Sequence, residues 1–162
     1  VFDSNIGRTI REIFLNNKDL GNNIEILMLC VARCAFLKEM ESFFDKYDVI
    51  IVDRFYLSIL AMQGKTQGDR ELINYIRLHM GDIPEPSYLF FIDTSPIECQ
   101  RRVVERQNGC DRIEKLGLHF HSEVAQRYKV MLKSESNVFV VNGNHDVNTV
   151  HSNIVNLVQN IL

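Results

Sequence analysis

The apolar and polar residues of this chain fall into blocks that predict helices and strands in alternation. Apolar residues at helical spacing predict a helix over residues 6–16 and a longer, more apolar helix over residues 24–47. Further helices are predicted over residues 57–62, 69–80, 96–107 and 118–134, and a closing helix is expected after residue 146. Three short apolar runs, over residues 49–53, 88–93 and 138–141, predict strands.

The first predicted strand is the most informative one. Its four consecutive β-favouring residues, Val49 to Val52, indicate a strand that is covered on both faces. Strands that alternate with helices predict an α/β fold, a three-layer parallel sheet with helices on both faces. Because ligands of such sheets bind outside the carboxyl ends of the strands, we expect Asp53 and Arg54 to lie at a binding edge.

Composition narrows the class of protein. The chain has 162 residues, of which 46% are hydrophobic, and this predicts a single domain over residues 1–162. No apolar run is long enough to span a bilayer, and the net charge of −3 gives no general basic field for nucleic acid. We therefore expect a cytoplasmic protein without membrane or nucleic-acid partners, in which individual arginines bind any phosphate.

Cysteines and histidines do not predict a metal site. The four cysteines are Cys30, Cys34, Cys99 and Cys110, without a C-x-x-C pair, and they are interpreted as buried free thiols. His119 and His121 alternate but have no cluster of cysteines and carboxylates nearby, so a solvated segment is the preferred interpretation.

From the last residue of the first predicted strand onward, six residues match a motif of the thymidylate kinases, written DR…S…AYQG. They are Asp53, Arg54, Ser58, Ala61, Gln63 and Gly64. Residues 25–33 resemble the family's E.L.F.A.R helix, and residues 111–114 match its lid signature DRIE. Further matches are residues 10–15, residues 91–96, and Arg127 with Tyr128. The chain resembles this family, in order and spacing, over nearly its whole length.

The resemblance implies the fold of a P-loop nucleoside monophosphate kinase, with a lid over about residues 102–117. It implies transfer of the γ-phosphoryl group of ATP, bound with Mg²⁺, to dTMP, which yields dTDP for dTTP biosynthesis. The substrates would be dTMP and ATP. The resemblance also implies a homodimer formed through the helix over residues 24–47.

The resemblance further implies the roles of the acceptor-side residues. Arg54 would grip the phosphate of dTMP, a task that suits a guanidinium fork. Asp53 would orient Arg54 or organise the water shell of Mg²⁺, and Arg33 would contact the thymine ring. From the residues alone, Asp53 and Arg54 could equally form a structural ion pair, and Arg33 could extend to the surface.

Two departures from the family pattern predict looser substrate selection. Leu29 occupies the place of a base-stacking Phe, and Met62 replaces the aromatic residue that walls off the sugar. Ser58 and Gln63 can offer hydrogen bonds near the base or sugar, or they can simply be polar residues at a helix end.

On the donor side, Arg102 and Arg106 lie four residues apart and project from one helix face. By themselves they would form an ordinary solvated basic face. The resemblance implies that both bind ATP, and that Arg106 or Arg112 neutralises the transferring phosphoryl group. Such an arginine is worth roughly three to five orders of magnitude in rate.

Residues Asn142, Gly143 and Asn144 follow the last strand, where the family holds the adenine of ATP. Gly143 would allow close approach of the backbone. A turn capped by Asn144 or Asp146 is the structural alternative, and the two interpretations are compatible.

One part of the kinase pattern is not found, since no G-x-x-x-x-G-K-[ST] sequence occurs. We therefore expect a partial kinase domain that lacks the N-terminal strand, P-loop and helix and that is inactive by itself. Two alternative functions stay open. A deoxynucleoside kinase would have an Asp-Arg motif too but would need a carboxylate base, and a non-catalytic interaction protein would not need the aligned arginines.

Overall fold

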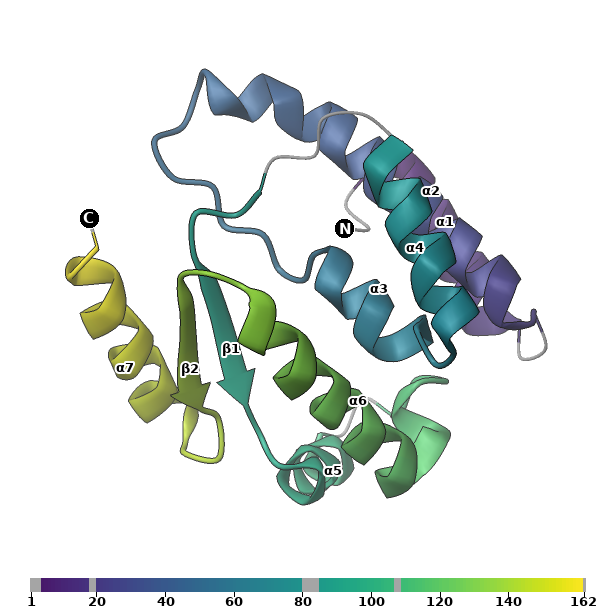
Figure 1. Ribbon diagram of the computed structural model, residues 1–162. Helices are drawn as coiled ribbons and strands as arrows, with labels where there is room; N and C mark the ends of the chain where they lie inside the picture. The colour runs from purple at the N-terminus through teal and green to yellow at the C-terminus, as the bar shows by residue number, and fades with distance from the viewer. Residues whose placement is uncertain (1–3, 18–19, 80–84, 107–108, 162) are drawn as a thin grey trace. The chain divides into compact units, whose positions relative to one another are not determined.

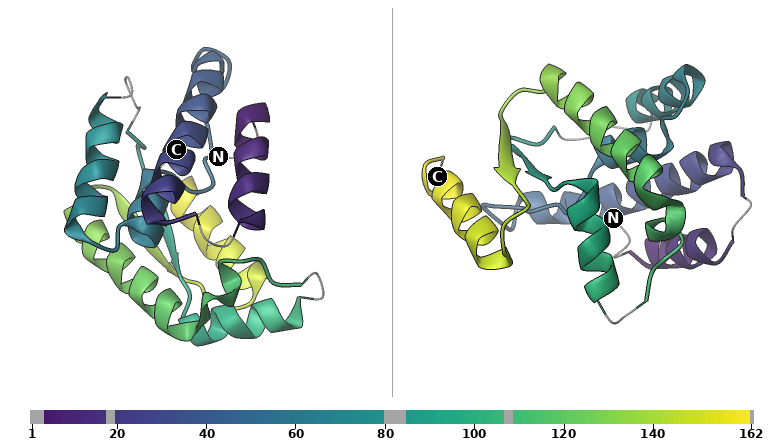
Figure 2. Two further views of the ribbon diagram at one scale, coloured as in Figure 1. Left: turned by 90° about the vertical axis from the view of Figure 1, so that its right-hand side faces the viewer. Right: turned by 90° about the horizontal axis from the view of Figure 1, so that it is seen from below.

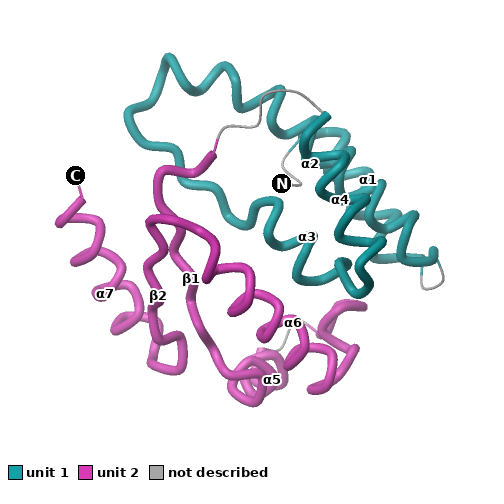
Figure 3. The backbone as a smooth tube through the Cα atoms, viewed as in Figure 1, with its two compact units in different colours: residues 1–84 teal, residues 85–162 magenta. Residues whose placement is uncertain are grey.

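The computed structural model describes residues 4–17, 20–79, 85–106 and 109–161 (Figure 1). The chain divides into two compact units, residues 1–84 and residues 85–162 (Figure 3). No helix in the described ranges has the length and apolar character needed to cross a membrane.

The described part of unit 1 is helical. Its helices are α1 (Asn5–Asn16), α2 (Asn22–Phe44), α3 (Tyr56–Gln63) and α4 (Gln67–His79). Helix α1 begins after Ser4, whose hydroxyl oxygen accepts a hydrogen bond from the amide of Gly7 at 2.8 Å. It lies beside α2, and Ile10 and Phe14 provide its buried face (Figures 1 and 2).

Helix α3 forms the interior of unit 1. Six of its eight residues are buried, and it packs against α2 and α4. Helix α4 starts two residues earlier than predicted because Thr66 and Asp69 cap it reciprocally. The Thr66 amide donates to the Asp69 carboxylate at 2.8 Å, and the Asp69 amide donates to the Thr66 hydroxyl at 3.2 Å. Residue 80, the predicted end of this helix, lies outside the described ranges.

Unit 2 combines two strands with helices. Its elements are β1 (Leu89–Asp93), α5 (Pro96–Glu105), η1 (Glu114–Leu116), α6 (Gly117–Met131), η2 (Leu132–Ser134), β2 (Val138–Asn142) and α7 (Val147–Gln159). The strands pair in parallel, with Leu89 opposite Val138 and Asp93 opposite Asn142. Helices α6 and α7 lie on opposite sides of this strand pair (Figures 1 and 2). The carboxyl ends of both strands therefore meet at the same edge.

Local capping explains where the helices of unit 2 begin. Pro96 opens α5, as predicted, and the Ser95 hydroxyl accepts from the Glu98 amide at 3.2 Å. The Asp146 carboxylate accepts from the amides of Asn148 and Thr149, which confirms the predicted cap of the last helix. The predicted helix over residues 118–134 divides into α6 and the short η2.

The strand predicted over residues 49–53 is wrong for this structure. Ile51 is 91% exposed, and residues 49–53 pair with no strand in the described part of the chain. A β-favouring run becomes a strand only when a neighbouring strand satisfies its backbone groups. The described sheet accordingly has two strands, β1 and β2, and the wider three-layer sheet is not seen in these residues.

The expectation for the cysteines holds in part. All four are free thiols, but only Cys30 is buried, and Cys99 is exposed. Cys99 is exposed because α5 contributes no buried residue to unit 2. Burial raises the pKa of Cys30 to about 11 and also raises the pKa of Cys34, one turn further along α2.

Candidate functional site

In unit 1, the buried guanidinium of Arg33 contacts the turn that precedes α3. Arg33 is only 5% exposed, so the alternative in which it extends to the surface is wrong. Its Nη1 donates to the main-chain oxygen of Arg54 at 2.9 Å. Its Cζ lies over the ring of Phe55, 4.9 Å from the centroid. One guanidinium thus contacts two consecutive residues of the turn.

Arg54 has an unusual backbone conformation. Its φ of 63° lies in the left-handed region, which is uncommon for residues other than glycine. Its exposed side chain donates from Nη1 to the sulfur of Met62 at 3.6 Å. In the described residues Arg54 forms no ion pair with Asp53, so the structural ion pair considered above is not formed. The charge of Arg54 remains accessible from solvent.

The other predicted acceptor-side residues lie on α2 and α3. Leu29 is one turn before Arg33 and is half-buried, as are Ser58 and Met62. Gln63 is 3% exposed, and its main-chain oxygen accepts from the side chain of Asn22 at 2.8 Å. The side-chain oxygen of Gln63 is buried without a hydrogen-bond partner in the described part of the chain. Such an acceptor is costly unless a ligand or water completes it.

In unit 2, Arg102 holds the loop that follows β2. Its Nη2 donates to the main-chain oxygens of Gly143 at 2.7 Å and His145 at 2.8 Å. The side-chain oxygen of Asn144 accepts from the Ser95 amide at 2.9 Å, and the Gly143 amide donates to the Asp93 carbonyl at 3.0 Å. The structure therefore brings Arg102 together with residues 142–144, whereas Arg106 binds Glu114 instead.

Glycine is the residue that fits at position 143 without displacing its neighbours. A Cβ atom at this position would lie 2.0 Å from the Thr94 hydroxyl and 2.7 Å from a methyl group of Ile92. Both distances are far below van der Waals contact, so any side chain would force the end of β1 to shift. The close approach seen here is to the end of β1 and the residue after it.

The carboxylate of Glu98 orients Arg102. Its Oε1 accepts from Nε of Arg102 at 2.7 Å, and both of its oxygens accept from Arg101 at 2.7 Å. Hydrogen bonds from Arg101, and next from Arg102, lower the pKa of Glu98 to about 2. Glu98 is therefore ionised at neutral pH. It was not predicted as a site residue, although its spacing of four residues from Arg102 was a visible signal.

Arg106 is paired within the predicted lid. Its Nη2 donates to both carboxylate oxygens of Glu114, at 2.6 and 2.7 Å. Glu114 also accepts from the Asp111 amide at 2.9 Å, and Asp111 accepts from the Glu114 amide at 2.9 Å. Arg112 is half-buried in the same segment. The DRIE sequence thus forms a compact turn that binds Arg106, and residues 107–108 of the lid lie outside the described ranges.

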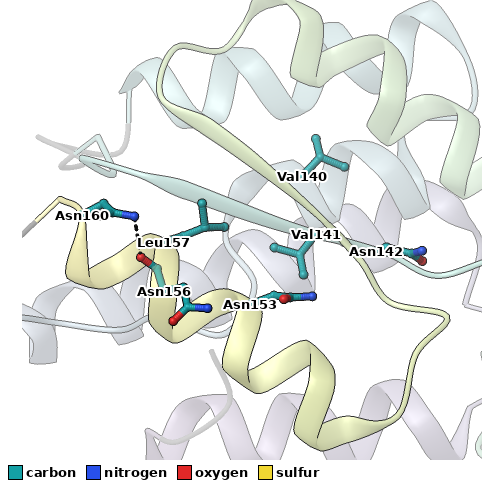
Figure 4. Close-up of a pocket in the computed structure, with 7 residues that line it drawn as sticks. All are labelled: Val140, Val141, Asn142, Asn153, Asn156, Leu157 and Asn160. Atoms are coloured by element: carbon teal, nitrogen blue, oxygen red, sulfur yellow. Dashed lines mark hydrogen bonds between the residues drawn. The ribbon is translucent and has the colours of Figure 1, made fainter.

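A pocket of about 340 Å³ lies between β2 and α7 (Figure 4). Its lining residues are Val140, Val141, Asn142, Asn153, Asn156, Leu157 and Asn160. Asn153 and Asn156 of α7 and its C-cap residue Asn160 line one side, and Asn160 donates to the main-chain oxygen of Asn156 at 2.8 Å. Only Asn142 belongs to the predicted site.

Within the described residues, no group of three or more His, Cys, Asp or Glu side chains could hold a metal ion by itself. Asp93, at the end of β1, forms an ion pair with Lys129 at 2.9 Å. Asp53 is exposed and not paired in this way. A magnesium ion that arrives with a nucleotide takes one or two carboxylates in addition to phosphate oxygens, and Asp53 fits this requirement.

Comparisons with known proteins identify relatives of this chain. The family profile described as thymidylate kinase matches residues 2–154. The thymidylate kinase of Thermosipho melanesiensis is 30% identical over 159 residues, which cover 97% of this chain and 78% of that protein. The thymidylate kinase of Finegoldia magna is 28% identical over 160 residues, which cover 96% of this chain and 78% of that protein.

The fold has a solved counterpart as well. The crystal structure of thymidylate kinase from Ehrlichia chaffeensis superposes with a TM-score of 0.71 at 21% identity, and the match covers 96% of this chain and 75% of that one. Together these matches define the protein as a kinase, a phosphotransferase. The chain belongs to the thymidylate kinase family. The resemblance inferred from the sequence motifs is confirmed.

Proposed function

We propose that the protein transfers the γ-phosphoryl group of ATP to dTMP and releases dTDP and ADP. Membership of the family supports this reaction. The observation that carries it is Arg54, whose exposed guanidinium extends from a left-handed turn beside Met62. A guanidinium held in this way offers two parallel N–H donors to the phosphate of an acceptor nucleotide.

The acceptor would bind against α2 and α3. Arg54 would hold its phosphate, and Arg33 would donate to its base from the buried end of the site. Leu29 and Met62 would contact the base and the sugar, while Ser58 and Gln63 would complete the hydrogen bonds. The buried, unpartnered oxygen of Gln63 supports its part in this arrangement.

The donor would bind at the loop that Arg102 holds. Asn142, Gly143 and Asn144 would contact its base, and Arg102 would keep their main chain in place. Arg106 and Arg112 would neutralise the charge of the transferring phosphoryl group. For this Arg106 has to exchange the Glu114 carboxylate for phosphate oxygens, an exchange that costs little because the pair is about half exposed on the arginine side.

Magnesium would enter with ATP, bridge its phosphate oxygens and reduce their negative charge. Asp53 is the residue of this chain that would orient the water shell of the ion, because its carboxylate is exposed directly beside Arg54 in the sequence. Orientation of Arg54 by the same carboxylate is the second role we propose for it.

The proposal extends to assembly and location. Helix α2 carries exposed apolar side chains at Ile24, Leu27 and Val31, each about half exposed. We propose that they support a homodimer formed through α2 in the cytoplasm. Sedimentation of the purified protein tests this, with Leu27→Asp expected to shift it to a monomer.

The test of the reaction compares two acceptors. The protein, with whatever N-terminal sequence its gene encodes, is incubated with Mg-ATP and either dTMP or thymidine, and the nucleotides are separated by chromatography. This form is the wild type of every experiment. We expect dTDP from dTMP and no product from thymidine. Product from thymidine alone would favour the deoxynucleoside kinase, because that enzyme phosphorylates a sugar hydroxyl. Absence of product from both acceptors would favour a non-catalytic protein.

A further inference from the structure

The contact between Arg33 and the turn at Arg54 has a feature that base recognition does not require. A side chain that only reads a base would direct its donors toward the ligand. Here one donor of Arg33 is used on the main-chain oxygen of Arg54, at 2.9 Å. The same guanidinium stacks over Phe55, the next residue of the turn.

This turn needs external support. Arg54 has a φ of 63°, and left-handed backbone at a residue with a Cβ persists only when its surroundings hold it. The Arg54 carbonyl would move if the main-chain angles of that residue relaxed. A buried donor fixed on this carbonyl therefore opposes the relaxation, and the stacked ring of Phe55 opposes it from the following residue.

We propose that Arg33 is a positioning residue for Arg54: its hydrogen bond to the Arg54 carbonyl and its contact with Phe55 fix the turn from which Arg54 reaches the acceptor phosphate. The proposal rests on the proposed function, in which Arg54 binds that phosphate. A guanidinium has five N–H donors, so Arg33 can hold the carbonyl and still donate to a base. Base binding and phosphate binding would then be coupled through a single buried side chain.

A lysine at position 33 would keep the charge but could not reproduce both contacts. Its ammonium is a compact point charge, whereas the guanidinium is planar and can stack and donate at the same time. Arg33→Lys therefore separates the presence of a charge from the support of the turn.

The experiment measures how much the phosphate contributes to binding. Dissociation constants for dTMP and for thymidine are determined by isothermal titration calorimetry, and their ratio gives the contribution of the phosphate. In the wild type we expect thymidine to bind at least about tenfold more weakly than dTMP, as charge-assisted hydrogen bonds predict. In Arg33→Lys we expect this ratio to fall to about one, because Arg54 no longer points at the phosphate.

A matched control comes from the same unit. Arg70 also donates from Nη1 to main-chain oxygens, those of Gly64 at 3.0 Å and Lys65 at 3.4 Å, and in the described part of the chain it makes no hydrogen bond to the turn at Arg54. Arg70→Lys is expected to leave the ratio unchanged. A second variant, Phe55→Leu, removes the stacked ring and keeps Arg33, and we expect the ratio to fall about threefold. This variant tests the proposal if Arg33→Lys does not fold, as judged by circular dichroism.

The possible outcomes distinguish the positioning role of Arg33 from the phosphate-binding role of Arg54. If Arg33→Lys weakens dTMP and thymidine by the same factor and keeps their ratio, Arg33 acts on the base alone and the positioning role is overturned. A ratio that stays unchanged in Phe55→Leu would overturn it as well. If the wild type binds dTMP and thymidine equally, the phosphate role of Arg54, and with it the proposed function of that residue, is wrong.

Discussion

The two units build their arginine sites in different ways. In unit 1, Arg33 is almost completely buried and holds main-chain and aromatic groups, and it leaves Arg54 exposed on a left-handed turn. In unit 2, Arg102 and Arg106 are 41% and 50% exposed and are paired with Glu98 and Glu114. The first arrangement is fixed by burial. In the second, an exposed ion pair that a nucleotide phosphate can replace holds Arg106, while Arg102 also donates to the main-chain oxygens of Gly143 and His145.

This difference has a physical consequence for catalysis. Exposed ion pairs contribute about 0–1 kcal/mol each, so exchanging Glu114 for a phosphate costs Arg106 little. The partly buried hydrogen bond from Arg33 to the Arg54 carbonyl costs more to break, since it leaves this carbonyl unsatisfied. We therefore expect a rigid acceptor site and an adaptable donor site.

The largest effect is expected in the lid. At saturating dTMP and Mg-ATP, Arg106→Ala or Arg112→Ala should lower kcat by about three orders of magnitude or more, because the transferring phosphoryl group loses its positive partner. Arg101→Ala is the control, since Arg101 lies on α5, the helix that ends just before Arg106, and pairs with Glu98 and Glu105. Near-normal kcat in both lid variants would show that the donor site works without these charges.

The second-largest effect is expected on the free energy of unfolding, which is compared between one variant in each unit. Arg33→Met should lower the free energy of unfolding by about 2 kcal/mol, because the Arg54 carbonyl loses its buried donor. Arg106→Met should lower it by less than about 1 kcal/mol, because Arg106 is an exposed side chain that is ion-paired with Glu114. Urea unfolding of both variants measures these values. Equal losses would remove the distinction between the two units.

A smaller effect on stability is expected from a change next to the end of β1. Gly143→Ala should destabilise the protein by about 1 kcal/mol, since the new Cβ atom requires Thr94 and Ile92 to shift. Gly68→Ala is the control, because the nearest atom to a Cβ there is 3.9 Å away and the residue lies in α4. That variant should be neutral or slightly more stable. Thermal unfolding of the two variants distinguishes these results.

The smallest effect depends on pH. The pKa of Glu98 is lowered to about 2 by Arg101 and Arg102, so this carboxylate stabilises the folded state above its ordinary pKa of 4.5, and the contribution disappears as the pH falls toward 2. The unfolding midpoint of Glu98→Gln should lie below that of the wild type at pH 6, and the two should converge near pH 2. A constant difference at all pH values would mean that the charge of Glu98 does not matter.

Helices were well predicted because their signals are local. Apolar spacing, Pro96 and Asp146 act within one or two turns, and the observed helices begin where those residues cap them. Local signals could not show whether residues 49–53 form a strand, because strand formation depends on pairing with another strand elsewhere in the chain. The same β-favouring residues leave Ile51 exposed here.

The residues of the candidate site could be predicted, but the contacts between them could not. The motifs identified Arg33, Arg54, Arg102 and Arg106, but no pattern indicates that Arg54 adopts a left-handed conformation, since arginine has no preference for it. The stacking of Arg33 on Phe55 depends on how α2 packs against the turn. Glu114 was part of the DRIE motif, yet only the folded turn shows that it binds Arg106.

The most direct test of the central claim is kcat/KM for dTMP in the wild type and in Arg54→Met, with Mg-ATP held at saturation. The account predicts dTDP formation by the wild type and a loss of about a hundredfold or more in kcat/KM for the variant, because the acceptor phosphate loses its bidentate partner. A variant that phosphorylates dTMP as efficiently as the wild type would contradict the assignment of Arg54 and the acceptor site built around it.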